Sequence, residues 1–161
     1  MYSHKRVLVA LDGSPSAEAV LRFVLDIAGP LDMTVRLLRV LEPIAAVSVE
    51  GTIVSGFDDL EMRRREAAEY LKLLAGRLQA KGVITTCEVR EGRAATEILA
   101  AARANKTDLI AMATHGRTGL GRLLFGSVAE ELLRQAPVPV FMIRQPESAD
   151  VLAAAQEGAA R

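Results

Sequence analysis

Short apolar runs alternate with amphipathic segments along most of this chain. The run Val7–Leu11 is apolar throughout, and the stretch Asp108–Ala113 becomes apolar directly after its first residue. A run that is apolar on both faces is typical of a central strand in a parallel sheet. Between such runs, apolar residues recur at helical spacing, as Val20, Val24 and Ile27 do. The pattern predicts strands and helices in alternation.

The alternation predicts an α/β fold. The predicted strands span Val7–Leu11, Met33–Leu41, Val83–Arg90, Asp108–Ala113 and Val138–Ile143. The predicted helices start after Ser14, run from about Asp58 to Lys81, include Ile98, Leu99 and Ala102, and start at Ser127. This order is typical of an open five-stranded parallel sheet with helices on both faces, a Rossmann-like arrangement. The first and fourth strands, being the most apolar, are expected to be neighbours at its centre.

Several local signals refine this prediction. Ser14 can cap the first helix, and Pro15 suits the first helical position. Ser127 and Glu130 have the S-x-x-E spacing of a capping box. Pro139 cannot donate to a strand ladder, which assigns the last strand to an edge of the sheet.

Val83–Arg90 alternates cleanly, as an edge strand does. Cys87 shares a face with Val83 and Val89, which favours a small buried apolar side chain. The long connection Glu42–Phe57 shows no clear period.

Composition narrows the possibilities further. The 161 residues suit one domain, expected over 1–145, and the Ala-rich segment 146–161 is expected to be a tail. The formal net charge of zero argues against nucleic acid or an anionic membrane as partner. The single cysteine excludes an internal disulfide and a multi-cysteine metal site. The first apolar run is too short for a signal peptide or a membrane span, so a cytoplasmic protein is expected.

The segment between Thr114 and Ser127 carries the candidate chemistry. Its glycines are Gly116, Gly119, Gly121 and Gly126, and Arg117 and Arg122 add positive charge. Such a loop lets backbone N–H groups face a ligand, and it leads into a helix N-terminus that favours an anion. It predicts a phosphate cradle; the alternative is a flexible connection before a capped helix. A P-loop is excluded because Ser127 stands where its lysine should be.

Taken together, these segments resemble the universal stress protein family from about Lys5 to Arg144. The nucleotide-binding members carry G-x-x-G, nine residues, then G-S or G-T. Here nine residues separate Gly116 from Gly126, and Ser127 follows. Ala113 stands where the motif has its first glycine. The opening Val9–Ser14 also resembles the family.

The resemblance implies a site for ATP between the end of the first strand and the glycine loop. Asp12 would contact the ribose side, Val40 would offer backbone groups to the adenine edge, and Ala113 would lie near the ribose. Gly116, Gly126 and Ser127 would hold the phosphates. The complete set of nucleotide-binding residues expected is Ala10, Asp12, Val40, Met112, Ala113, Gly116, Arg117, Gly126, Ser127 and Val128. Mg²⁺ can accompany the phosphates, because it needs few protein ligands.

The functional prediction is an ATP-binding stress-response regulator with slow or no hydrolysis. Two alternatives stay open: a dimeric scaffold that has lost nucleotide binding, and a weak nucleotide hydrolase using His115 or Asp12. No carboxylate pair or positioned base is evident for rapid phosphoryl transfer, so no catalytic residue is assigned. The resemblance also implies a homodimer formed through the last strand, Val138–Ile143.

Overall fold

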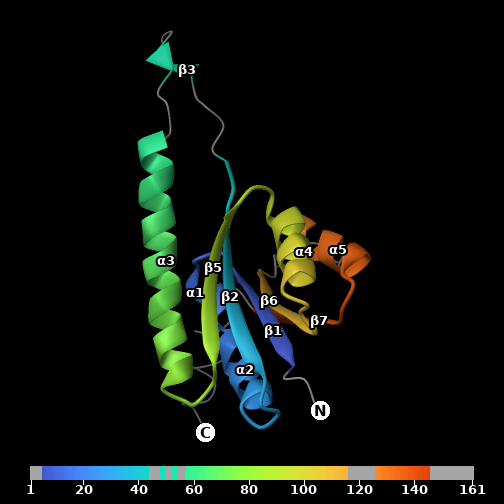
Figure 1. The fold of residues 1–161 in the computed structure, drawn as a ribbon. Coiled ribbons are helices and arrows are strands. Elements are labelled where there is room, and N and C mark those ends of the chain that lie inside the picture. Colours follow the sequence, from blue (N-terminus) through green and yellow to red (C-terminus); the bar gives the residue numbers. More distant parts are fainter. Residues whose placement is uncertain (1–4, 44–47, 50–51, 54–56, 116–125, 146–161) are drawn as a thin grey trace, which may run out of the picture.

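A five-stranded parallel sheet forms the centre of the computed structural model, which describes residues 5–43, 48–49, 52–53, 57–115 and 126–145 (Figure 1). Its strand order is β5-β2-β1-β6-β7, and every pairing in it is parallel. The strands are β1 (Arg6–Leu11), β2 (Thr34–Leu41), β5 (Thr85–Glu91), β6 (Leu109–His115) and β7 (Val140–Gln145). The predicted fold class is confirmed.

The most apolar strands lie at the centre of the sheet, as predicted. β1 pairs with β2 on one side and with β6 on the other. Leu8, Val9 and Ile110 are fully buried there, because helices cover both faces of the sheet. Both predicted edge strands, β5 and β7, are at the edges. Pro139 directly precedes β7 and contributes only its carbonyl, which accepts a 3.0 Å hydrogen bond from Ile110 N–H.

Two helical layers enclose two separate apolar cores. The helices are α1 (Pro15–Glu18), α2 (Val20–Ala28), α3 (Phe57–Gln79), α4 (Ala94–Ala104) and α5 (Ser127–Gln135). On one face, α1, α2 and α3 pack on side chains such as Val9 and Leu37; on the other, α4 and α5 pack on Leu8 and Leu38. In Figure 1, α3 stands on one side of the sheet and α4 and α5 on the other.

The connection between β2 and α3 contains regular structure that the sequence did not predict. Two short strands, β3 (Ser48–Val49) and β4 (Thr52–Ile53), pair antiparallel within it. α3 spans Phe57–Gln79, close to the predicted helix, and its buried stripe includes Ala67, Leu71 and Leu78. No helix in the part of the chain that the structure describes is long and apolar enough to cross a membrane.

The prediction that Cys87 is buried is wrong. Cys87 is an exposed free thiol, although Thr85 on the same face of β5 is buried and Val89 is half-buried. β5 has a neighbouring strand on one side only, so an edge residue between covered positions can reach solvent. Burial of part of the side chain raises the pKa of the thiol, and the charge of Lys72 opposes that rise.

The predicted capping box at α5 is also wrong. Gly126, with φ +85° and ψ +155°, is the N-cap residue, and as a glycine it has no side chain with which to cap the helix. Ser127 is instead the first helical residue, one position too late for its hydroxyl to act as the N-cap. At α1 the corresponding prediction is confirmed: Ser14 is the N-cap, its Oγ accepts a 3.2 Å hydrogen bond from Ala17 N–H, and Pro15 follows.

Candidate functional site

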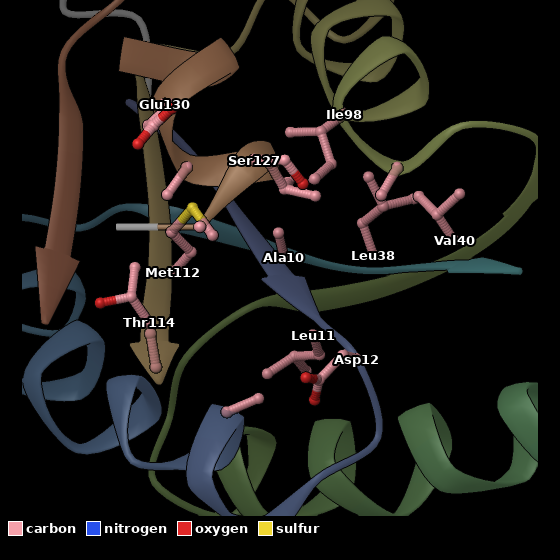
Figure 2. Close-up of a pocket in the computed structure, with 16 residues that line it drawn as sticks. Ala10, Leu11, Asp12, Leu38, Val40, Ile98, Met112, Thr114, Ser127 and Glu130 are labelled. Carbon is pink, nitrogen blue, oxygen red and sulfur yellow. The ribbon is translucent and has the colours of Figure 1, made fainter. Parts of the chain in front are cut away.

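A cavity of about 620 Å³ opens at the carboxyl ends of β1, β2 and β6 (Figure 2). β2 and β5 lie on one side of β1, whereas β6 and β7 lie on its other side. The strand order therefore reverses between β1 and β6. Ligands of open α/β sheets bind at such a point. The lining residues are Ala10, Leu11, Asp12, Ala17, Leu38, Val40, Ala94, Ile98, Met112, Ala113, Thr114, Gly126, Ser127, Val128, Ala129 and Glu130.

The cavity has an apolar end and a more polar end. Leu38 and Val40 from β2 and Ile98 from α4 gather at one end, while Thr114 and Glu130 lie toward the other (Figure 2). An apolar slot with a few polar groups is the usual make-up of a small-molecule site, and the volume is in the usual range of about 300–1,000 Å³. The arrangement suits a flat apolar ring system joined to a polar group.

Asp12 lies at the end of β1, in the turn that leads to α1. Its Oδ1 accepts two hydrogen bonds from Ser14, one from the backbone N–H at 2.8 Å and one from the hydroxyl at 2.6 Å. Gly13 completes this turn with φ +88°, a conformation that favours glycine. Asp12 is therefore a turn residue, and its exposed carboxylate also borders the cavity.

The N-terminus of α5 forms another wall. The carbonyl of Gly126 accepts the N–H of Glu130 at 3.0 Å, which starts the helix. The N–H groups of the first helical turn have no partner within the helix, and they carry the positive end of its dipole. Apart from its chain neighbours, none of the residues that the structure describes has an atom within 4 Å of a Cβ added at Gly126, so on their side the backbone is open to a ligand. This wall suits a phosphate or another anion.

β6 supplies the floor between these walls. Ala113 pairs in register with Ile143 of β7, and Thr114 is buried, with its hydroxyl donating to the Ile143 carbonyl at 3.5 Å. Thr114 thus ties β6 to the edge strand at the margin of the cavity. Ala113 is half-buried and borders the same space with Met112.

Most residues expected at a nucleotide site border this one cavity. Those that line it are Ala10, Asp12, Val40, Met112, Ala113, Gly126, Ser127 and Val128. Gly116 and Arg117 lie outside the described residues, as do Gly119, Gly121 and Arg122. Nowhere in the described ranges do three or more His, Cys, Asp or Glu side chains gather as metal ligands.

The sequence reasoning missed the wall contributed by α4. Ala94 and Ile98 line the cavity from the first turns of that helix, and Ala94 N–H donates to Oε1 of Glu42 at 3.2 Å. The i, i+4 spacing of Ala94 and Ile98, directly after the end of β5, was the available signal. Any helix that faces a core shows the same spacing, so the spacing does not distinguish a binding site from ordinary core packing.

The family of the chain follows from comparison with known proteins. Residues 3–144 match the model of the universal stress protein family. The chain belongs to the universal stress protein family. A universal stress protein from Methanocaldococcus jannaschii is 32% identical over 148 residues, which cover 89% of this chain and 84% of the relative. The crystal structure of a family protein from Burkholderia pseudomallei superposes with TM-score 0.69 at 28% identity, covering 87% of this chain and 96% of that one.

Several solved structures with this fold hold adenine nucleotides. A universal stress protein family protein from Arabidopsis thaliana has AMP bound, with TM-score 0.65 and 19% identity, covering 90% of this chain and 94% of that chain. One from Archaeoglobus fulgidus is in complex with dAMP, with TM-score 0.57 and 20% identity, covering 89% and 99%. Another universal stress protein is in complex with cAMP, with TM-score 0.63 and 18% identity, covering 89% and 98%. At these identities the likeness establishes the fold.

Proposed function

We propose that this universal stress protein is an ATP-binding regulatory module that holds the nucleotide in the cavity at the ends of β1, β2 and β6. The observation that carries the proposal is the convergence of the expected residues on one cavity, with Asp12 on one wall and the N-terminus of α5 on another. Family structures that hold AMP, dAMP and cAMP support the same class of ligand.

The cavity offers a suitable surface for each part of a nucleotide. The base would lie in the apolar end between Val40 and Ile98, where the backbone of β2 can recognise its edge. The ribose would meet Asp12 beside Ala113. The phosphates would meet the N–H groups of Ser127 and Val128, in the open space left by Gly126.

Mg²⁺ would accompany ATP through its phosphates. The charged side chains among the described lining residues are the carboxylates of Asp12 and Glu130. A divalent cation on the phosphates would offset their charge, and Mg²⁺ usually keeps several waters and takes few protein ligands. The proposed module hydrolyses ATP slowly or not at all, because the sequence shows no carboxylate pair or positioned base for rapid phosphoryl transfer.

Titration calorimetry with Mg²⁺ and ATP, AMP or cAMP tests the proposal. The protein should bind ATP, and Gly126→Val should abolish binding while the chain stays folded by circular dichroism. Valine would both block the phosphate wall and disfavour φ +85° at this position. Gly76→Val is the matched control: Gly76 lies on the exposed face of α3 with no atom within 4 Å of an added Cβ. Equal binding by all three proteins would refute the proposal. Phosphate release from ATP by the same samples should be slow or undetectable.

A scaffold without nucleotide is the competing function, and Ala113 favours it. Its methyl group stands where the family motif has glycine, and Ala113 borders the cavity. Ala113→Gly separates the two functions. If the methyl blocks the ribose, the unmodified protein fails to bind and the variant gains binding; if it is tolerated, the two bind within about threefold of each other.

We also propose that the protein forms a homodimer through β7. The apolar residues Val140, Phe141, Met142 and Ile143 are each only half-buried, and among the described strands β7 has a partner on one side only. A free apolar edge favours pairing with another chain. Sedimentation velocity should give a dimer of about twice the 17.3 kDa chain mass, and Met142→Lys should shift it to monomer. A monomer at high micromolar concentration would contradict this assembly.

A further inference from the structure

Arg39 extends from β2 on the face of the sheet opposite the cavity. Its neighbours Leu38 and Val40 line the cavity, and side chains alternate along a strand, so Arg39 points to the other face with Leu37. Arg39 is also the register partner of Leu11, the last residue of β1. This placement brings its side chain beneath the turn that carries Asp12.

The guanidinium of Arg39 packs directly against Gly13. A Cβ added at Gly13 would lie 2.8 Å from both Cζ and Nη2 of Arg39 and 3.0 Å from Nη1. Such distances are too short for real contacts, so the guanidinium fills the space that a side chain would need. The φ of +88° favours glycine at position 13, and a side chain there would also have to displace the guanidinium of Arg39.

Tyr70 of α3 supports the guanidinium. Cζ of Arg39 lies 5.5 Å from the centroid of the Tyr70 ring, within the range of a cation–π contact. The ring itself packs against the core on this face of the sheet. Burial and the nearby carboxylates of Glu18 and Asp12 raise the pKa of Tyr70, and the charge of Arg39 opposes that rise. The charges of Asp12 and Arg39 therefore both act on the hydroxyl of Tyr70.

Packing, rather than an ion pair, fixes Arg39. Within the part of the chain that the structure describes, no group accepts a hydrogen bond from Arg39 or forms a salt bridge with it. Arg36, three residues earlier on the same strand, differs: its Nη1 lies 3.2 Å from Oε2 of Glu88. Arg39 is held by its contacts with Gly13 and Tyr70.

We propose that Arg39, supported by Tyr70, is a positioning residue for the nucleotide site, holding the Asp12–Ser14 turn from the opposite face of the sheet. This inference rests on the proposed function. With the guanidinium present, the turn is supported from below and the Asp12 carboxylate keeps its orientation toward the cavity. Without the guanidinium, a space opens beneath Gly13, and glycine does not restrict the backbone by itself. The turn then gains conformational entropy, which is lost again when a ligand binds.

Arg39→Ala tests this role through nucleotide affinity. The variant should bind ATP about 5–10-fold more weakly, the scale expected when a cation–π contact and the order it imposes are lost. Arg22→Ala is the matched control, because Cζ of Arg22 lies 5.0 Å from the Phe23 ring centroid on α2, away from the cavity. Tyr70→Phe keeps the ring and should bind like the unmodified protein, whereas Tyr70→Leu should weaken binding as Arg39→Ala does.

Two further readouts separate positioning from general stability. In an Asp12→Asn background, Arg39→Ala should cost clearly less affinity than it does alone, because the residue that it positions is already impaired. Without ligand, amide hydrogen exchange at Ser14 should be several-fold faster in Arg39→Ala than in Arg22→Ala, since Ser14 N–H donates to Asp12.

Unchanged exchange at Ser14 in Arg39→Ala would overturn the inference, as would unchanged affinity. If the unmodified protein binds no nucleotide, the proposed function fails by itself. The exchange measurement then still decides whether Arg39 holds the turn.

Discussion

The hydroxyl of Ser14 donates a 2.6 Å hydrogen bond to Oδ1 of Asp12. The same oxygen of Ser14 accepts the N–H of Ala17 at 3.2 Å, which caps α1. One side chain thus joins the end of β1, the turn that borders the cavity and the first helix. The helix start and the orientation of Asp12 are therefore coupled.

Replacing Ser14 by alanine should affect both properties. Ser14→Ala should lower the free energy of unfolding by about 1 kcal/mol, the usual cost of losing an N-cap. It should also weaken nucleotide binding a few-fold, because Asp12 loses the hydrogen bond from the hydroxyl. Urea denaturation and titration calorimetry measure the two effects. Ser16→Ala, within α1, is the control and should change stability by less than about 0.5 kcal/mol. Equal effects of the two substitutions would contradict the coupling.

Gly126 and Gly76 should respond oppositely to alanine. At both positions an added Cβ meets no atom within 4 Å from the described residues beyond the adjoining backbone, so neither substitution meets a steric barrier from them. Gly126 has φ +85° and ψ +155°, a region that is almost restricted to glycine, so alanine should destabilise by about 1–3 kcal/mol. Gly76 lies inside α3, where alanine should stabilise by about 0.5–1 kcal/mol. Chemical denaturation of the two variants tests the sign, and a neutral Gly126→Ala would show that the backbone relaxes there.

The fold could be predicted because the apolar runs and the position of proline in the sequence indicate the same strand arrangement. Apolar runs such as Val7–Leu11 belong to strands covered on both faces, and Pro139 assigns the last strand to an edge; the structure has both features. Cys87 shows where this reasoning fails. Alternation predicts which residues share a face, but it does not predict how far a helix covers the edge of the sheet.

The site was predictable where it rests on the ends of strands, and less so elsewhere. The family resemblance assigned Asp12 and Val40 to the site, and parallel topology agrees, because parallel strands end at one edge of the sheet. The wall formed by Ala94 and Ile98 depends on how α4 packs, which spacing alone does not determine. The role of Arg39 was equally hidden, because its contacts with Gly13 and Tyr70 join segments far apart in sequence.

Cys87 should react with thiol reagents in the folded protein, but slowly. The side chain is exposed on β5, while partial burial raises the pKa of its thiol and so reduces the thiolate fraction at neutral pH. Modification by a disulfide reagent should be complete without denaturant and slower than that of glutathione at pH 7.5. Because the charge of Lys72 opposes the rise in pKa, Lys72→Gln should slow the reaction further. Cys87→Ser gives the background, and reaction only after unfolding would show that Cys87 is covered.

Glu88 connects β5 to two neighbouring elements through charged hydrogen bonds. Its Oε1 accepts from Nε of Arg90 at 2.6 Å, and its Oε2 accepts from Nη1 of Arg36 at 3.2 Å and from Nδ2 of Asn105 at 3.1 Å. Burial alone would raise the pKa of the Glu88 carboxyl. The hydrogen bonds from Arg90 and Asn105 and the nearby arginine charges outweigh it, so the pKa lies below its ordinary value of 4.5.

The stabilisation from ionised Glu88 should therefore disappear in acid. Because the folded-state pKa is depressed, the contribution is complete above the ordinary pKa of 4.5, which the unfolded chain keeps, and it is lost as the pH falls through the folded-state value. At pH 7, Glu88→Gln should lower the free energy of unfolding by about 1–2 kcal/mol, the scale of hydrogen bonds to a charged group. The difference from the unmodified protein should shrink steadily below pH 4. Glu69→Gln, on the exposed face of α3, is the control and should show little difference at either pH. A Glu88→Gln deficit that stays constant from pH 7 to pH 3 would mean that the side chain contributes through its shape and not through its charge.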